Sequence, residues 1–394
     1  MSEFQTASQA KQAQNTEGIP LTELSIFPAT KAQIYESRKR TFTMWGRGVT
    51  LEEYLKRDAR YGGHEVSADG RLVTWVLARR DDPKGIDFLC SCETYKREGF
   101  VVNANATTGN SVVAYSVAAL FTSPRNRKKG YATHLMRMLH WILAPPDDLP
   151  QFPTEVWGNQ PDRGKWIDSE QIIKGHGGDA VFSTLYSDVG PEIYRGCGFL
   201  PGAEGWVVTD FLSSGWDVDS VGVFGVDDED GWEWLDIKGV YDYWKVDADL
   251  MKREMEESNP TNAICTLLPD KGVAEFQIIR LSYFWNPLGI TDWGLRRGKT
   301  FASWTIDVRP DSSYVMLITR LRAEVDEFEN LVKMLVKFGR RHKISHFEVW
   351  GLKEEFREQF GFVKTWNKDI HLPSIKCYNS DDLKWLFNER FCYC

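Results

Sequence analysis

The chain has 394 residues, of which 42% are hydrophobic and 26% charged, and its formal net charge at pH 7 is −8. This length exceeds the usual size of a single hydrophobic core, so two domains are expected. The acidic balance argues against a general nucleic-acid-binding protein, and no apolar run approaches the ~18 residues of a membrane helix. We therefore expect neither nucleic acid nor a membrane as a partner.

The cysteines and the N-terminal segment indicate the compartment. The chain has seven cysteines, and Cys90/Cys92 and Cys392/Cys394 are each separated by one residue. Zinc sites use a wider Cys-x2-Cys spacing, and an odd number of cysteines does not close a disulfide framework. We expect reduced thiols, no metal and a cytoplasmic protein. Residues 1–20 are polar and lack an apolar signal core, which predicts a disordered tail.

Strand and helix patterns alternate along the first half of the chain. Residues 21–30 predict a strand, and two helices follow over 31–45 and 51–60, the second beginning with the capping pattern Thr50-x-x-Glu53. Residues 71–78 and 86–95 predict two antiparallel strands joined by a turn at 81–85. An apolar strand over 112–121 follows. After an irregular insertion between 144 and 178, residues 180–186 predict one more strand.

The segment 123–139, SPRNRKKGYATHLMRML, predicts an anion-binding site. It joins the apolar strand to an apolar helix, and the first turn of a helix carries unpaired N–H groups and the positive end of the helix dipole. Gly130 allows close approach of a ligand to the main chain. Arg125, Arg127, Lys128 and Lys129 add positive charge, so phosphate is the expected ligand.

The spacing Arg127-x-x-Gly130-x-Ala132, directly after an apolar strand, resembles the pyrophosphate loop of the GNAT acetyltransferase superfamily. It matches neither a Walker loop nor a Gly-x-Gly-x-x-Gly turn. The resemblance implies acetyl-CoA as co-substrate. It also implies that the cofactor contacts Leu120, Phe121, Thr122, Arg127, Lys128, Lys129, Gly130, Tyr131, Ala132 and Thr133.

A second stretch, residues 185–199 (LYSDVGPEIYRGCGF), resembles another GNAT signature. In that signature a strand diverges from its neighbour, a short helix follows, and a Tyr lies four residues before a Gly-Phe pair; here these are Tyr194, Gly198 and Phe199. Ser187 stands where many members have an Asn that binds the cofactor, and we expect it to make a shorter contact. Gly190 stands where a small Ala is usual.

Several segments resemble a narrower group, the fungal L-lysine N6-acetyltransferase family. They are SCETY at 91–95, KKGYA at 128–132, LYSDVGPEIY at 185–194 and NERFCYC at 388–394. The resemblance implies an α/β (α+β) protein with a mixed, mainly antiparallel GNAT sheet flanked by helices. It also implies a catalytic domain over 21–215 and a degenerate GNAT-like domain over 216–394 that closes the substrate cleft.

The C-terminal half supports a second copy on its own pattern. Residues 301–308, 314–320 and 344–350 predict strands, 248–257 and 323–340 predict helices, and Phe360-Gly361-Phe362 repeats the Gly-Phe ending. No basic glycine loop precedes the helix over 323–340. We therefore expect that this half does not bind CoA.

Acetyl transfer to an amine requires a proton acceptor, because a lysine side chain has an ordinary pKa of ~10.4 and is protonated at neutral pH. Glu93, a carboxylate in an otherwise apolar strand, is the first candidate base. Asp188, as base or as ionic partner of the amine, and the terminal carboxylate of Cys394 are the alternatives. By resemblance, the backbone over 120–122 positions the thioester and Tyr194 protonates the departing sulfur.

The predicted function is acetyl-CoA-dependent N-acetylation of a small amine, with the ε-amine of free L-lysine as leading acceptor by resemblance. The alternatives are a secondary-metabolite amine as acceptor, or a catalytically weak GNAT-like binding module. Arg47, Arg79 and Lys376 are candidate partners for the carboxylate of a zwitterionic substrate. A monomer or homodimer is expected.

Overall fold

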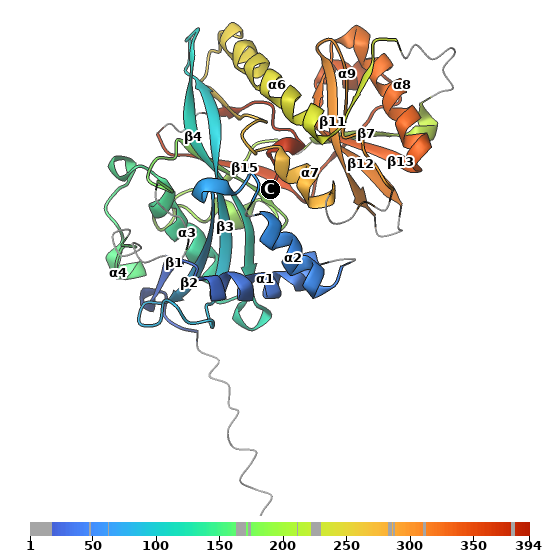
Figure 1. The fold of residues 1–394 in the computed structure, drawn as a ribbon. Helices are drawn as coiled ribbons and strands as arrows, with labels where there is room; N and C mark the ends of the chain where they lie inside the picture. The colour runs from blue at the N-terminus through green and yellow to red at the C-terminus, as the bar shows by residue number, and fades with distance from the viewer. Residues whose placement is uncertain are drawn as a thin grey trace, which may run out of the picture.

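The computed structural model describes residues 18–46, 49–61, 63–162, 171, 175–210, 212–221, 230–282, 286, 288–309, 313–379 and 383–394. These residues form two sheets, of nine and seven strands, each flanked by helices. Figure 1 shows the N-terminal half of the chain around the first sheet and most of the C-terminal half around the second.

The first sheet begins with four consecutive antiparallel strands. They are β1 (Leu24–Pro28), β2 (Leu72–Arg79), β3 (Cys90–Val102) and β4 (Gly109–Thr122). The next strand, β5 (Phe182–Ser187), is parallel to β4. Beyond it lie β15 (Leu372–Cys377) and β6 (Val207–Val208), while β9 (Ile264–Leu267) pairs with β3 and with β16 (Lys384–Trp385).

Helices cover both faces of this sheet. On one face, α1 (Lys31–Trp45) and α2 (Leu51–Tyr61) pack, and the Ser37 hydroxyl of α1 lies 2.9 Å from the Ser91 hydroxyl of β3. On the other face, α3 (Tyr131–Leu143) buries its apolar side against residues that include Trp75 and Cys92. Short helices α4 (Thr154–Trp157) and α5 (Glu192–Arg195) lie in the connections that follow.

The second sheet has the order β14-β7-β13-β12-β11-β10-β8. Its strands are β7 (Leu212–Asp217), β8 (Glu233–Leu235), β10 (Gly294–Arg297), β11 (Thr300–Val308), β12 (Tyr314–Arg322), β13 (Ile344–Trp350) and β14 (Lys364–Asn367). Strands β12 and β13 are parallel and are connected through α8 (Val325–His342). The other helices of this half are α6 (Ile237–Glu257), α7 (Glu275–Ser282) and α9 (Glu354–Gln359).

Most predicted elements are present, and the mixed, mainly antiparallel sheet flanked by helices is confirmed. Two elements differ most at their starts. The strand predicted over 86–95 begins at Cys90, because the residues before it form a turn in which Ile86 is 58% exposed. The helix predicted over 248–257 begins at Ile237, where the Asp236 carboxylate caps it by accepting from the Gly239 N–H group.

The two sheets exchange chain segments. The predicted domain boundary between residues 215 and 216 falls inside β7, a strand of the second sheet. In addition, β9, β15 and β16 come from the C-terminal half but pair within the first sheet. Strands far apart in sequence pair here because each covers an edge that would otherwise expose unpaired backbone groups. Residues 216–394 therefore contribute to both sheets.

Candidate active site

Strands β4 and β5 separate halfway along their length. Their parallel pairing covers Ala114–Val117 and Phe182–Leu185, although β4 continues to Thr122 and β5 to Ser187. At the same level β4 carries an extra residue relative to β3, and Ala119 has a φ of 52°. Such a bulge bends a strand and leaves backbone groups outside the ladder. Leu120, Phe121 and Thr122 lie on the separated part of β4, as predicted from the motif.

The segment that follows β4 is the one predicted to bind an anion. Lys128 and Gly130 have left-handed backbone conformations, with φ values of 61° and 78°, and Gly130 caps α3. The first hydrogen bond of this helix runs from the His134 N–H group to the Gly130 carbonyl, so the N–H groups of Tyr131, Ala132 and Thr133 precede it. These groups are therefore available to an anion.

Side chains around this helix start divide into exposed cations and one anchor. Arg127, Lys128 and Lys129 are exposed, and a Cβ atom added at Gly130 would meet nothing within 4 Å. Tyr131 is buried, and its hydroxyl accepts a 2.8 Å hydrogen bond from the Ile19 N–H group. The basic residues thus surround an open space at the positive end of α3.

Ser187 has a different environment from the one predicted. It is fully buried, its hydroxyl donates to the Gly190 carbonyl at 2.6 Å, and it accepts from the Val189 N–H group at 3.2 Å. Both bonds lie within the turn after β5, because a serine side chain is short enough to bond its own backbone neighbours. Ser187 shapes the turn, and the predicted cofactor contact stays a prediction.

Tyr194 lies on α5, just beyond that turn, and is half-buried. Burial raises the pKa of its hydroxyl well above the ordinary value, and the nearby Cys197 and Asp188 raise it further. The hydroxyl therefore keeps its proton at neutral pH, as a proton donor must.

Glu93 lies in the centre of the sheet on the face covered by α1 and α2. It is half-buried, pairs across the strands with Thr74 of β2 and Ala118 of β4, and accepts a 3.1 Å hydrogen bond from the Tyr95 hydroxyl. Directly paired residues share one face of a sheet, so Glu93 lies beside the bulge of β4 on that face. Its proposed role as base stays a prediction.

Asp188, the alternative base, is held by a histidine from the C-terminal half. Its Oδ1 atom lies 2.7 Å from Nδ1 of His371 and accepts a 3.0 Å hydrogen bond from the His371 backbone N–H group. Partial burial raises the pKa of this carboxyl, but the bonds from His371 outweigh burial and lower the pKa below the ordinary value. Asp188 thus remains an anion and is a weak base.

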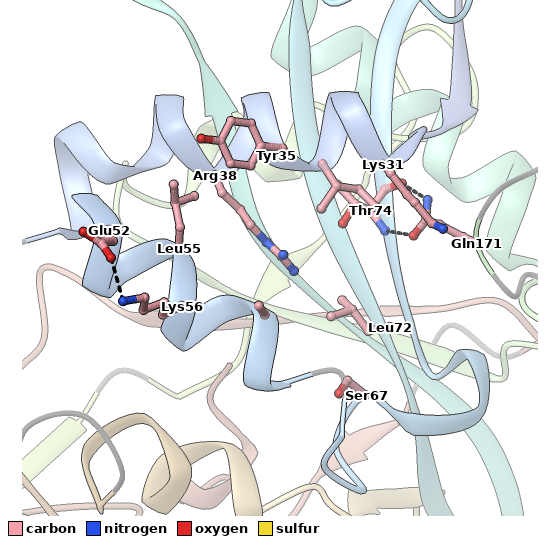
Figure 2. A pocket seen from close by; sticks show the side chains of 12 residues that line it. Lys31, Tyr35, Arg38, Glu52, Leu55, Lys56, Ser67, Leu72, Thr74 and Gln171 are labelled. Carbon is pink, nitrogen blue, oxygen red and sulfur yellow. Dashed lines mark hydrogen bonds and ion pairs between the residues drawn. The ribbon is translucent and has the colours of Figure 1, made fainter. Parts of the chain in front are cut away.

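A cavity of about 630 Å³ lies between α1, α2 and β2. Figure 2 shows Arg38 extending from α1 into the space between α2 and the strand that carries Thr74 and Leu72. Of its lining residues Lys31, Arg38 and Lys56 are cationic and Glu52 is anionic, and Glu52 pairs with Lys56 at 2.6 Å. Thr74 in the floor is the cross-strand neighbour of Glu93. The cavity therefore lies one strand away from the candidate base.

Other candidate residues lie elsewhere. Arg79 pairs with Asp81 at 2.7 Å, Lys376 donates to the Glu204 carbonyl, and Arg47 lies outside the described residues. Cys394 is half-buried and packs against the small cluster of Val66, Tyr95 and Ile279, which Ala118 of β4 also contacts.

Two absences concern the described part of the chain. It contains no group of three or more His, Cys, Asp or Glu residues placed to hold a metal ion. None of its helices is long and apolar enough to span a membrane.

Comparison with solved structures assigns the fold. A GCN5-related N-acetyltransferase from Kribbella flavida is similar to this chain with a TM-score of 0.50 and 12% sequence identity. The match covers 90% of this chain and 71% of that protein. A probable N-acyltransferase of unknown function from Enterococcus faecalis gives a TM-score of 0.53 at 9% identity, with 90% and 72% covered. The chain has the GNAT fold.

Sequence comparisons refine this assignment. Residues 223–394 match the family model described as "LYC1 GNAT-like C-terminal domain". A lysine acetyltransferase from Yarrowia lipolytica is 22% identical over 362 residues, which cover 82% of this chain and 83% of the relative. The predicted resemblance is confirmed, and the comparisons support an acyltransferase of GNAT type.

His371 was not predicted as a site residue. It stands outside both GNAT signatures, and its place beside Asp188 depends on the pairing of β15 with β5, two strands nearly 200 residues apart. A lone histidine before a strand pattern gives no local signal of such a contact. The structure alone brings it to the site.

Proposed function

We propose that the protein transfers the acetyl group of acetyl-CoA to a small amine, with the ε-amine of free L-lysine as the leading acceptor. One observation carries the proposal: the separation of β4 from β5 leads directly into the glycine-capped, basic start of α3. A phosphate site and a strand with exposed backbone groups are thus adjacent, as a phosphorylated thioester carrier requires.

The helix start accounts for binding of the cofactor. The N–H groups of Tyr131, Ala132 and Thr133 donate to the pyrophosphate, and Lys128 and Lys129 supply opposite charge at its edge. The separated part of β4 holds the pantetheine and thioester, and its bulge at Ala119 places backbone groups beside the carbonyl.

The chemistry proceeds by direct transfer. A general base takes a proton from the amine, the nitrogen attacks the thioester carbonyl, and the C–S bond breaks as Tyr194 protonates the departing sulfur. Tyr194 suits the last step because burial keeps its hydroxyl protonated. Glu93 and Asp188 are the carboxylates predicted to act as the general base.

The cavity beside β2 suits an acceptor with an anionic end. Arg38 and Lys31 offer positive charge to a carboxylate, and Thr74, Glu93 and Ala118 form a row across three strands on one face. Two strand spacings amount to about 10 Å. A long, unbranched diamino acid held by its carboxylate in the cavity thus reaches toward β4. The name of the Yarrowia relative agrees with lysine as this acceptor.

The decisive experiment measures CoA release by the purified full chain with acetyl-CoA and a panel of amines. The panel contains L-lysine, L-ornithine, cadaverine, which lacks the carboxylate, and aromatic amines typical of secondary metabolism. Lysine is expected to give the highest kcat/KM, and mass spectrometry is expected to place the acetyl group on the ε-nitrogen. Binding of acetyl-CoA without CoA release for any amine contradicts the proposal and favours a binding module.

A further inference from the structure

A contact between the two halves of the chain lies at the end of β5. Asp188 follows β5 where this strand has left β4, and His371 precedes β15, whose first residue, Leu372, pairs with Ser187. Nδ1 and the backbone N–H group of His371 both approach the same oxygen of Asp188, at 2.7 and 3.0 Å. The backbone hydrogen bond therefore holds the two residues together and keeps the imidazole close to the carboxylate.

The backbone and packing of His371 restrict its imidazole further. Its φ of 54° lies in the left-handed region, which is uncommon for residues other than glycine and costs energy that the surrounding contacts must offset. The ring lies 5.0 Å from that of Tyr393 and 6.0 Å from that of Trp350, and 28% of the side chain is exposed. The imidazole is thus both oriented and open to solvent on one side.

Charged groups around His371 come from three other segments. Arg390 and Lys368 stack over the Trp350 ring at 4.5 and 4.0 Å, and the Trp350 indole donates to Glu348 at 2.8 Å. Burial lowers the pKa of Lys368 to about 8. Asp188 and Tyr393 lie against the imidazole itself, whereas Arg390, Lys368 and Glu348 contact the neighbouring Trp350.

We propose that His371, oriented by Asp188, is the general base that accepts the proton of the attacking amine. This assignment rests on the proposed acetyltransferase function and names the residue that accepts the proton in that reaction. The Asp188 carboxylate lies 2.7 Å from Nδ1, and its negative charge favours the tautomer that has the proton on Nδ1 and the lone pair on Nε2. Within the described part of the chain, Nε2 makes no hydrogen bond. Asp188 orients His371 here as the aspartate orients the histidine in a serine-protease triad.

The proton balance of the step is complete. The ammonium group of the acceptor gives one proton to Nε2, and its nitrogen attacks the thioester carbonyl to form the new C–N bond. As the C–S bond breaks, Tyr194 gives its hydroxyl proton to the thiolate and takes up the second proton that the adduct nitrogen loses. The products are the N-acetylated amine, CoA as a thiol, and an imidazolium at His371 that returns its proton to water.

Asp188 acts through the histidine because it is a poor base itself. Its carboxyl stays ionised beside His371 and stabilises the imidazolium that forms on proton transfer. Asp188 is therefore a positioning residue. The proposal places the proton acceptor at the junction of the two halves, so the C-terminal half takes part in the chemistry.

The test compares three single variants of the full chain and the double variant of His371→Asn with Asp188→Asn. His371→Asn removes the imidazole but keeps a side chain that tolerates the left-handed backbone, and Asp188→Asn removes the charge of the positioning residue. His346→Asn is the matched control, because His346 forms a similar pair with Asp217, at 2.8 Å, in the second sheet. Steady-state CoA release with acetyl-CoA and L-lysine is measured from pH 5.5 to 9.5, together with the melting temperature and acetyl-CoA affinity.

We expect His371→Asn to lower kcat by about 10²- to 10⁴-fold, the range for loss of a general base, with the KM for acetyl-CoA nearly unchanged. The acidic limb of the kcat/KM profile disappears, and added imidazole restores part of the rate. Asp188→Asn lowers kcat by at least about tenfold, and the double variant is no slower than His371→Asn, because the two act as a unit. His346→Asn keeps its turnover and pH profile.

Two outcomes overturn the assignment while leaving the acetyltransferase function intact. One is a His371→Asn protein that turns over within about threefold of the unmodified chain with the same pH profile. The other is a loss that follows the melting temperature and resists imidazole, which shows that the pair only joins the two halves. Absence of CoA release by the unmodified chain refutes the proposed function and, with it, this role of His371.

Discussion

Replacement of Gly130 by Asp tests the cofactor site with little effect on the fold. The glycine has a φ of 78° at the cap of α3, and its substituent would enter open space. A left-handed backbone costs a residue with a Cβ atom about 1–2 kcal/mol, and an acidic side chain at a helix N-terminus recovers about 0.3–1 kcal/mol. The net loss of about 1 kcal/mol lowers the melting temperature by only a few degrees.

The effect on acetyl-CoA binding is expected to be much larger. Two unit charges about 5 Å apart at an effective dielectric constant of 20 repel by about 3 kcal/mol, so one phosphate charge facing the new carboxylate weakens binding by more than about 100-fold. Calorimetric titration with acetyl-CoA measures this loss. Gly202→Asp is the matched control, because Gly202 has a φ of 80° and equally open surroundings. Affinity within threefold of the unmodified chain, or equal losses in both variants, refutes the site.

Three further predictions concern catalysis and stability. Tyr194→Phe is expected to lower kcat at least tenfold with unchanged acetyl-CoA affinity in the same titration, since only the proton donor is lost; full turnover removes Tyr194 as the acid. Asp247→Ala removes a buried partner that lies 2.7 Å from both the buried Arg320 and the half-buried Arg322, and is expected to lower the free energy of unfolding by about 3–5 kcal/mol in urea; a loss below 1 kcal/mol contradicts this. Burial lowers the pKa of His140 from 6.5 to about 3, so the unfolded chain binds more protons between these values and stability falls as the pH drops below 6.5. A His140→Gln protein that loses as much stability as the unmodified chain between pH 7 and 5 refutes that origin.

Local sequence determined much of the first half of the fold. The helix over 31–45 has the predicted bounds, because Thr30 and Gln33 form a capping box at its start. The motif at 127–132 predicted the glycine-capped helix, because a left-handed cap and an apolar helical face are properties of neighbouring residues. These features need no distant partner.

Tertiary structure decided what depends on distant strands. The pairing of β15 with β5 brings His371 to Asp188, and no local pattern specifies which edge a short strand covers. The turn that encloses Ser187 depends on bonds to Val189 and Gly190 that sequence spacing alone does not select. Sequence by itself therefore determined the helix start that we propose as the phosphate site, because its signals are local. Only the folded chain decided which side chains surround the proposed acceptor site, because they come together through long-range strand pairing.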